Sequence, residues 1–167
     1  MSTPLTAHFT LEELLRPNTP LATVPEDVRA NLAALCAEIL EPVREHFGLP
    51  VRVTSGWRPF AYNAAIGGAK ASDHVYGRAA DFHVADSDKA PWEVNTLLAF
   101  HWIRENLAGK FGQLVWEDHR VKLSAPSRLW IHVAIRSVRH PGYPQDANRL
   151  LVSHAPKQYV PWQEDLA

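Results

Sequence analysis

The sequence predicts an α+β fold in which a small antiparallel sheet carries helices packed on one side. Two longer segments, residues 25–48 and 92–107, repeat apolar residues at helical spacing. With 167 residues and no internal repeat, the chain suits a single domain, 1–167. We expect the helices to cover one face of the sheet and to leave a cleft on the other. Four short segments have the apolar, β-rich pattern of strands: residues 51–54, 79–84, 113–117 and 129–135.

Helix start and stop signals divide the first fifty residues. A capping-box pattern, Thr10 followed by Glu13, predicts a short N-terminal helix over residues 10–16. Pro25 stands at a first-turn position with two acidic residues after it, which is typical of a helix start. Gly48 is placed to end this long helix.

The remaining connections are less regular. Pro42 lies inside the long helix and predicts a kink. Residues 62–69 predict a short helix that closes in a glycine pair. Residues 120–128 are interpreted as a hairpin loop between two strands. The tail, residues 140–167, is rich in proline and aromatic residues, and residues 148–152 within it are interpreted as a helical turn.

Composition limits the classes of function. Hydrophobic residues make up 46% and charged residues 21%, as in a folded globular protein. The net charge of −1, with no basic block, argues against a nucleic-acid binder. The single cysteine, Cys36, lies in a helical apolar pattern and is interpreted as a buried structural thiol. The N-terminus has no secretory signal pattern, and no segment approaches the roughly 18 apolar residues of a membrane span, so we expect no membrane insertion.

One stretch carries the candidate chemistry. His74 and Asp81 flank a bend at Gly77, and Ala79 follows the bend at the start of a predicted strand. An imidazole nitrogen and a carboxylate oxygen are ordinary zinc ligands, and a catalytic zinc needs about three protein ligands and an open position for water. Gly77 lets the chain turn without a Cβ atom. The stretch therefore predicts part of a zinc site.

Ser72, His74, Gly77, Ala79 and Asp81 match the S-x-H-x-x-G-x-A-x-D signature of the zinc D-Ala-D-Ala carboxypeptidase family. The chain resembles this family, which also includes phage endolysin peptidases that cut peptidoglycan stem peptides. The resemblance implies a hedgehog/DD-peptidase-like fold and one zinc ion per chain.

Three further short sequence motifs resemble motifs of the family. The S-G-W-R-P phrase at residues 55–59 implies that Arg58 binds a substrate carboxylate or carbonyl, which suits the bidentate guanidinium group. The W-I-H-V phrase implies that His132 is the third zinc ligand, beside His74 and Asp81. The Q-L-V-W-E phrase at residues 113–117 adds Gln113 as a substrate-binding candidate. Ser72 is a further candidate, which either contacts the substrate or holds its loop.

The general base is assigned to the strand before His132. In some relatives the base lies three residues before the last histidine, and that position here is Leu129, which cannot serve. Glu117 is our preferred base, since it can share a face with His132 on adjacent strands. Asp118 and His119 are the alternatives. His83 shares the face of Asp81 and is interpreted as structural rather than as a ligand.

The leading hypothesis is a zinc metallopeptidase that hydrolyses an amide bond of peptidoglycan stem peptides. A carboxypeptidase that removes a terminal D-Ala and an endopeptidase that cuts L-Ala–D-Glu are both open. The alternative is a non-catalytic, zinc-stabilised binding protein or phage structural protein of the same fold. Nucleophilic catalysis is disfavoured, because neither Cys36 nor Ser55 nor Ser72 lies in a nucleophile pattern. We expect a monomer that is made in the cytoplasm and acts on the cell wall after release, for instance during phage or prophage lysis.

Overall fold

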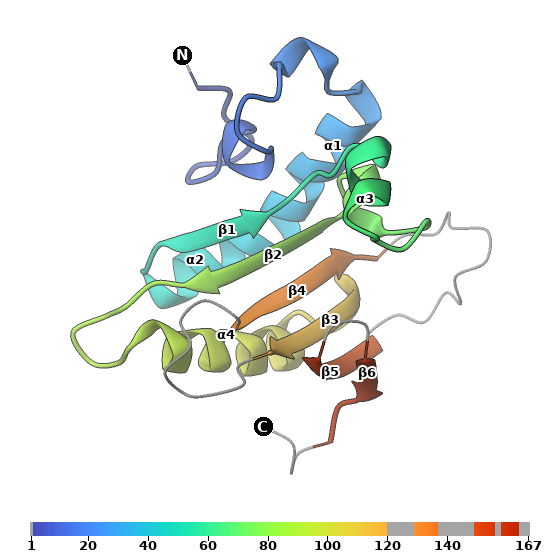
Figure 1. Ribbon diagram of the computed structural model, residues 1–167. Coiled ribbons are helices and arrows are strands. Elements are labelled where there is room, and N and C mark those ends of the chain that lie inside the picture. Colours follow the sequence, from blue (N-terminus) through green and yellow to red (C-terminus); the bar gives the residue numbers. More distant parts are fainter. Residues whose placement is uncertain (1, 120–128, 137–148, 156–157, 164–167) are drawn as a thin grey trace.

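The computed structural model describes residues 2–119, 129–136, 149–155 and 158–163. These residues form an α+β fold around one six-stranded sheet with the strand order β1-β2-β4-β3-β5-β6 (Figure 1). Neighbouring strands are antiparallel, except that β3 and β5 run parallel. The strands are β1 (Val51–Ser55), β2 (Ala79–Val84), β3 (Phe111–Asp118), β4 (Leu129–Ile135), β5 (Arg149–Ala155) and β6 (Gln158–Pro161).

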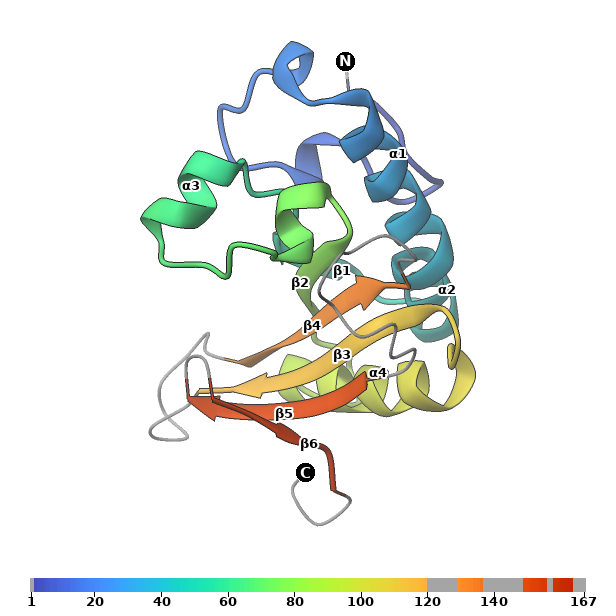
Figure 2. The same cartoon turned by 90° about the vertical axis from the view of Figure 1, so that its right-hand side faces the viewer.

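The longer helices lie on one face of the sheet, where α1 packs against β2 and β4, and α4 packs mainly against β2 and also against β4 and β3 (Figures 1 and 2). The short α3 and the loop after it rise beside the opposite face at one end (Figure 2). This confirms the predicted arrangement of helices on one side. The α-helices are α1 (Glu26–Leu35), α2 (Glu41–Phe47), α3 (Phe60–Ala65) and α4 (Trp92–Asn106), and the shorter turns are η1 (Glu12–Leu14), η2 (Leu21–Thr23), η3 (Cys36–Leu40) and η4 (Asp73–Tyr76).

The predicted kink at Pro42 takes the form of a π turn. The η3 segment has π-helical hydrogen bonding and joins α1 to α2, with Pro42 in the first turn of α2. Proline lacks an N–H group and its ring clashes with the carbonyl four residues earlier, so the widened turn relieves the conflict. The helix then ends as predicted at Gly48, which adopts a left-handed conformation with φ of 63°.

Strand alternation separates a core face from an open face. Phe82, Leu114 and Ile131 are fully buried and pack with helix residues such as Leu32 and Phe100 in a single core. On each strand, the residues directly before and after these buried ones point to the other side of the sheet. The open face therefore carries the polar side chains of β2, β3 and β4.

Two local predictions were wrong. Residues 10–16 form only the single 3-10 turn η1, although Thr10 and Glu13 make the expected capping contacts, with 2.7 Å between Thr10 N and Glu13 Oε2. The turn stops because the carbonyl of Leu14 accepts the N–H of Trp57 at 2.7 Å instead of continuing a helix. Residues 148–152 were predicted as a helical turn, but β5 begins at Arg149. The predicted loop at residues 120–128 lies outside the described residues.

The described part of the chain contains no helix with both the length and the apolar character needed to cross a bilayer.

The thiol of Cys36 is expected to be unreactive in the folded protein. Burial, assisted by the charges of Glu41 and Glu13, raises the pKa of Cys36 to about 12, so the nucleophilic thiolate is almost absent at neutral pH. Titration with a disulfide reagent at about pH 8 should give no reaction before unfolding and one thiol per chain after unfolding in guanidinium. Equal rates in the two states would contradict the buried position.

Candidate metal centre

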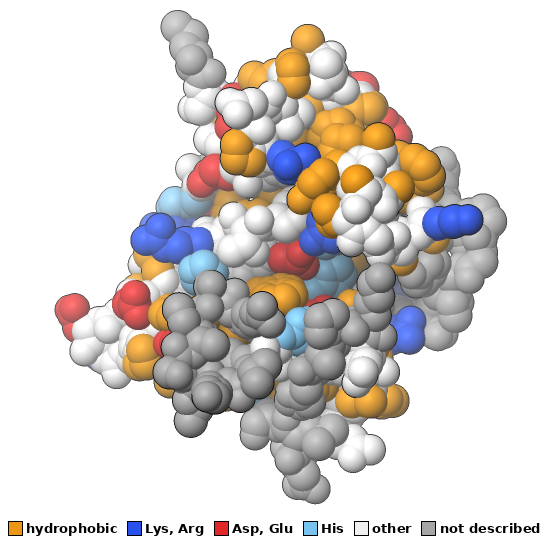
Figure 3. All heavy atoms as spheres, in the orientation of Figure 1, with side chains coloured by type: hydrophobic (Ala, Val, Ile, Leu, Met, Phe, Trp, Pro, Cys, Tyr) orange, Lys and Arg blue, Asp and Glu red, His pale blue; other side chains and the backbone are white. Residues whose placement is uncertain are grey.

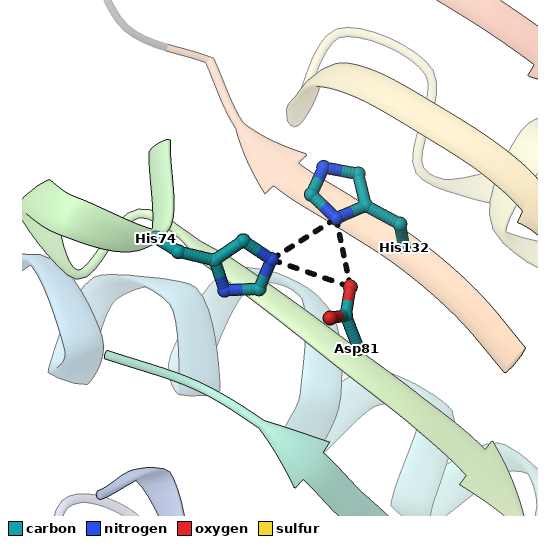
Figure 4. Close-up of side chains that lie close together, drawn as sticks. All are labelled: His74, Asp81 and His132. Atoms are coloured by element: carbon teal, nitrogen blue, oxygen red, sulfur yellow. Dashed lines mark hydrogen bonds and ion pairs between the residues drawn. The ribbon is translucent and has the colours of Figure 1, made fainter. Parts of the chain in front are cut away.

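Three predicted ligands meet on the open face of the sheet (Figure 4). Asp81 on β2 and His132 on β4 are directly opposite each other in the antiparallel ladder, so their side chains share a face. His74 enters from η4, just before β2. Figure 3 shows histidine, acidic and basic side chains gathered near the middle of this face.

The distances between the three ligand atoms fit one zinc ion. His74 Nε2 lies 3.2 Å from His132 Nδ1 and 3.3 Å from Asp81 Oδ1, and His132 Nδ1 lies 2.8 Å from Asp81 Oδ1. Tetrahedral zinc with bonds of about 2.0–2.1 Å places its ligands roughly 3.3 Å apart. Two imidazoles and one carboxylate are also a donor set that leaves a position for water.

The outer nitrogen of each imidazole is bonded to a carbonyl oxygen. His74 Nδ1 donates to the backbone carbonyl of Gly56 at 2.7 Å, and His132 Nε2 donates to Oε1 of Gln113 at 3.2 Å. A carbonyl oxygen only accepts, so both outer nitrogens carry the proton in neutral imidazole. The inner nitrogens, His74 Nε2 and His132 Nδ1, then present their lone pairs to the centre, as metal ligation requires.

The third ligand, Asp81, is ionised although it is buried. Burial by itself would raise the pKa of Asp81, but the adjacent imidazoles of His74 and His132 outweigh this effect and hold this pKa well below its usual range. Its second oxygen, Oδ2, forms an ion pair with Arg58, and Arg58 Nε donates to Ser55 Oγ at 2.8 Å. Arg58, predicted as a substrate residue, thus lies in the site and also orients a ligand.

The bend that carries His74 is fixed against the helices. Asn31 Nδ2 donates to the carbonyl of Tyr76 at 2.8 Å, and Trp57 Nε1 donates to the carbonyl of Val75 at 3.0 Å. Gly77 follows with φ of 69°, and a Cβ atom there would lie 2.8 Å from the carbonyl oxygen of Val28. Glycine is needed at this position for both its conformation and its size.

Substituting Gly77 by alanine is expected to destabilise the fold by about 2–5 kcal/mol, because backbone strain and overlap with α1 act together. Gly48→Ala is the matched control, since Gly48 has nearly the same φ but no atom within 4 Å of an added Cβ. That control should cost only about 1–2 kcal/mol. Urea unfolding of both variants measures the free energy of unfolding that each substitution removes. Equal losses of this free energy in the two variants would show that the close contact with α1 contributes nothing.

Gln113 is predicted to matter for metal affinity. Replacing it by leucine removes the acceptor for His132 Nε2–H, which frees the imidazole to rotate and to change tautomer. Zinc affinity should fall about 10–100-fold in competition with a chromophoric chelator. Gln158→Leu on the exposed strand β6 is the control and should bind zinc like the wild type. Unchanged affinity in Gln113→Leu would leave Gln113 with the substrate role alone.

Glu117 faces the same cleft from β3. Val115 lies opposite His132 in the ladder, and Glu117 is two residues further along, so it points to the same side. Glu117 is buried, and His119 Nε2 lies 2.8 Å from its Oε2 and 2.9 Å from Ser153 Oγ. Burial raises the pKa of Glu117, although the nearby His132 and His119 oppose this.

A cleft of about 840 Å³ joins all the predicted site residues. Asp118, one alternative base, does not line it, whereas His119, the other alternative, does. Tyr159 and Arg149 also line the cleft and were missed by sequence reasoning, because they belong to the unpredicted strands β5 and β6. Partial burial and the neighbouring carboxylate of Glu117 raise the pKa of Tyr159 to about 12. The predicted residues that line the cleft are Arg58, Ser72, His74, Asp81, Gln113, Glu117 and His132.

A family model described as Peptidase M15 matches residues 7–116, about two thirds of the chain. The chain belongs to the peptidase M15 family. Membership implies a zinc-dependent peptidase that acts in general on peptidoglycan peptides. The observed α+β sheet agrees with the hedgehog-like fold of M15 peptidases. Comparison with curated proteins gives no significant match.

The match covers two of the three candidate ligands of this M15 peptidase. His74 and Asp81 lie inside the matched region, while His132 and Glu117 follow it. The placement of His132 and Glu117 in the site therefore depends on the register of β2, β4 and β3.

Proposed function

We propose that the protein is a zinc peptidase that hydrolyses an amide bond within peptidoglycan stem peptides. It acts as a monomer with one zinc ion per chain. The observation that carries the proposal is the convergence of His74 Nε2, His132 Nδ1 and Asp81 Oδ1 beside the buried carboxylate of Glu117 in one cleft. A structural zinc site would not need a carboxylate base in the same cleft.

His74, Asp81 and His132 would hold the zinc ion. When bound, zinc supplies Lewis-acid polarisation of the scissile carbonyl group and of the attacking water molecule. Glu117 accepts a proton from that water molecule as its oxygen attacks the carbonyl carbon. The same carboxyl group then delivers the proton to the nitrogen of the leaving amine as the C–N bond breaks. Water and the amide are converted into a carboxylic acid and an amine, with no covalent intermediate.

Substrate contacts come from the walls of the cleft. Arg58 and Arg149 provide guanidinium groups for the carboxylates that are frequent in stem peptides. Ser72 and Gln113 line the same space and offer neutral hydrogen-bonding groups.

The test is digestion of purified muropeptides by the zinc-loaded protein, followed by mass spectrometry of the products. Pentapeptide muropeptides that lose one terminal alanine identify a carboxypeptidase, and a cut between L-Ala and D-Glu identifies an endopeptidase. A Glu117→Gln sample serves as the inactive reference. Intact muropeptides after long incubation with zinc-loaded wild-type protein would refute the proposed function.

A further inference from the structure

A second hollow lies on the open face, on the side of the metal centre away from Arg58. Its volume is about 480 Å³, and its walls include Trp92 from the start of α4, Trp130 from β4 and His83 from β2. We call it the Trp92 hollow. It shares Asp81 and Trp130 with the larger cleft. The metal ligand Asp81 therefore stands between two hollows rather than at the closed end of one.

The volumes of the two hollows indicate the size of the substrate. Pockets of about 300–1,000 Å³ hold drug-sized ligands, and both hollows fall in this range. A single alanine leaving group fills only a small part of either one. A peptide whose scissile bond lies at the metal centre can instead continue into both.

The walls of the Trp92 hollow are apolar, and its rim is charged. Leu129 and the two tryptophans provide apolar surface, and the ring of His83 lies 5.1 Å from that of Trp92. Arg52 lies opposite His83 across β1 and β2, and it is exposed. Asp86 also lines the hollow and is exposed, and its Oδ1 accepts the backbone N–H of Trp92 at 2.9 Å.

Apolar walls with one acidic and one basic group at the rim suit a long aliphatic side chain that ends in charge. Methylene groups would pack on the tryptophans, while Asp86 would pair with an ammonium group. Arg52 would pair with a carboxylate where the side chain carries one. The diamino acid of a stem peptide, lysine or diaminopimelate, has this chemistry.

We propose that the Trp92 hollow binds the diamino acid residue of the stem peptide on one side of the scissile bond, so that the enzyme cuts within the stem. The inference rests on the proposed function, since the peptide must first be a substrate of the metal centre.

The experiment compares two synthetic stem tetrapeptides that differ only at the third residue, lysine in one and norleucine in the other. Neither carries a terminal D-Ala-D-Ala. The zinc-loaded wild type should cleave both internally, with kcat/KM about tenfold higher for the lysine peptide. Asp86→Asn keeps an oxygen for the N–H of Trp92 but removes the charge, and should abolish most of this preference. Asp88→Asn, in the same loop and outside the hollow, is the matched control and should keep it.

A second pair of variants tests the walls. Trp92→Leu should raise KM for both peptides by about tenfold with little change in kcat. Trp102→Leu, the same change on the same helix away from the hollow, should leave KM unchanged.

Three outcomes would overturn the inference while leaving the proposed function intact. One is equal kcat/KM for the two peptides, and another is a lysine preference that survives in Asp86→Asn. The third is that the wild type cleaves only peptides that carry the muramyl sugar, whereas Trp92→Leu cleaves peptides with and without it equally well. That result would assign the hollow to the glycan. Failure to cleave any muropeptide or peptide would instead refute the proposed function itself.

Discussion

Replacing Glu117 by glutamine is expected to lower kcat about 10²–10⁴-fold on muropeptides while zinc stays bound. Glutamine has nearly the same shape but cannot accept the proton of the attacking water molecule. None of the three ligand atoms belongs to Glu117, so the metal centre should be unaffected. The measurement is the initial rate of product formation beside zinc content from the same sample.

Glu45→Gln provides the matched control, because Glu45 is exposed on α2 and does not line the cleft. Its kcat should equal that of the wild type. A Glu117→Gln variant with wild-type rates would assign the base to another group, such as His119, whose Nε2 lies 2.8 Å from Oε2 of Glu117. Loss of zinc in the same variant would mean that Glu117 is itself a ligand.

Replacing His132 by alanine is expected to remove both zinc binding and hydrolysis. Only His74 and Asp81 would remain, and two ligands do not hold a catalytic zinc ion. Added zinc should therefore stop stabilising the fold. At a free concentration 100 times the dissociation constant, a ligand of the native state contributes about 2.7 kcal/mol, which appears as a higher Tm in the wild type but not in His132→Ala.

His46→Ala is the control for this variant. His46 lies on α2, where its ring stacks on Trp102 at 4.5 Å between centroids, far from the ligand cluster in the fold. It should bind zinc and show the same zinc-dependent rise in Tm as the wild type. A zinc-dependent rise of equal size in His132→Ala would exclude His132 from the metal centre.

Local motifs account for the parts of the site that sequence reasoning anticipated. His74 on η4 and Asp81 on β2 are close in the sequence, so one local motif contains both residues. The strand that contains His132 was predicted with its observed bounds, Leu129–Ile135. Alternation along neighbouring strands then sufficed to predict that Glu117 and His132 share a face.

The missed features depend on contacts between distant segments. β5 pairs in parallel with β3, and such pairing leaves no local turn signal near Arg149. Tyr159 reaches the cleft only because β6 pairs with β5 beyond it. The bond from His132 to Gln113 likewise depends on strand register, so the phrase around Gln113 indicated a site residue but not its contact with a ligand.

The non-catalytic alternative makes a different prediction for the same residues. A zinc-stabilised binding protein would need His74, Asp81 and His132 but not Glu117. The buried carboxylate of Glu117 in the metal cleft is costly unless it has a role, because burial opposes its charge. Its presence there favours catalysis over a structural zinc site.

The most direct test of the zinc centre is native mass spectrometry of the protein after equilibration with zinc and removal of excess metal. The wild type should carry one zinc ion per chain, and His132→Ala should carry none, while His46→Ala keeps its zinc. A folded wild-type protein that retains no zinc, or a His132→Ala variant that retains it fully, would contradict the account of this site.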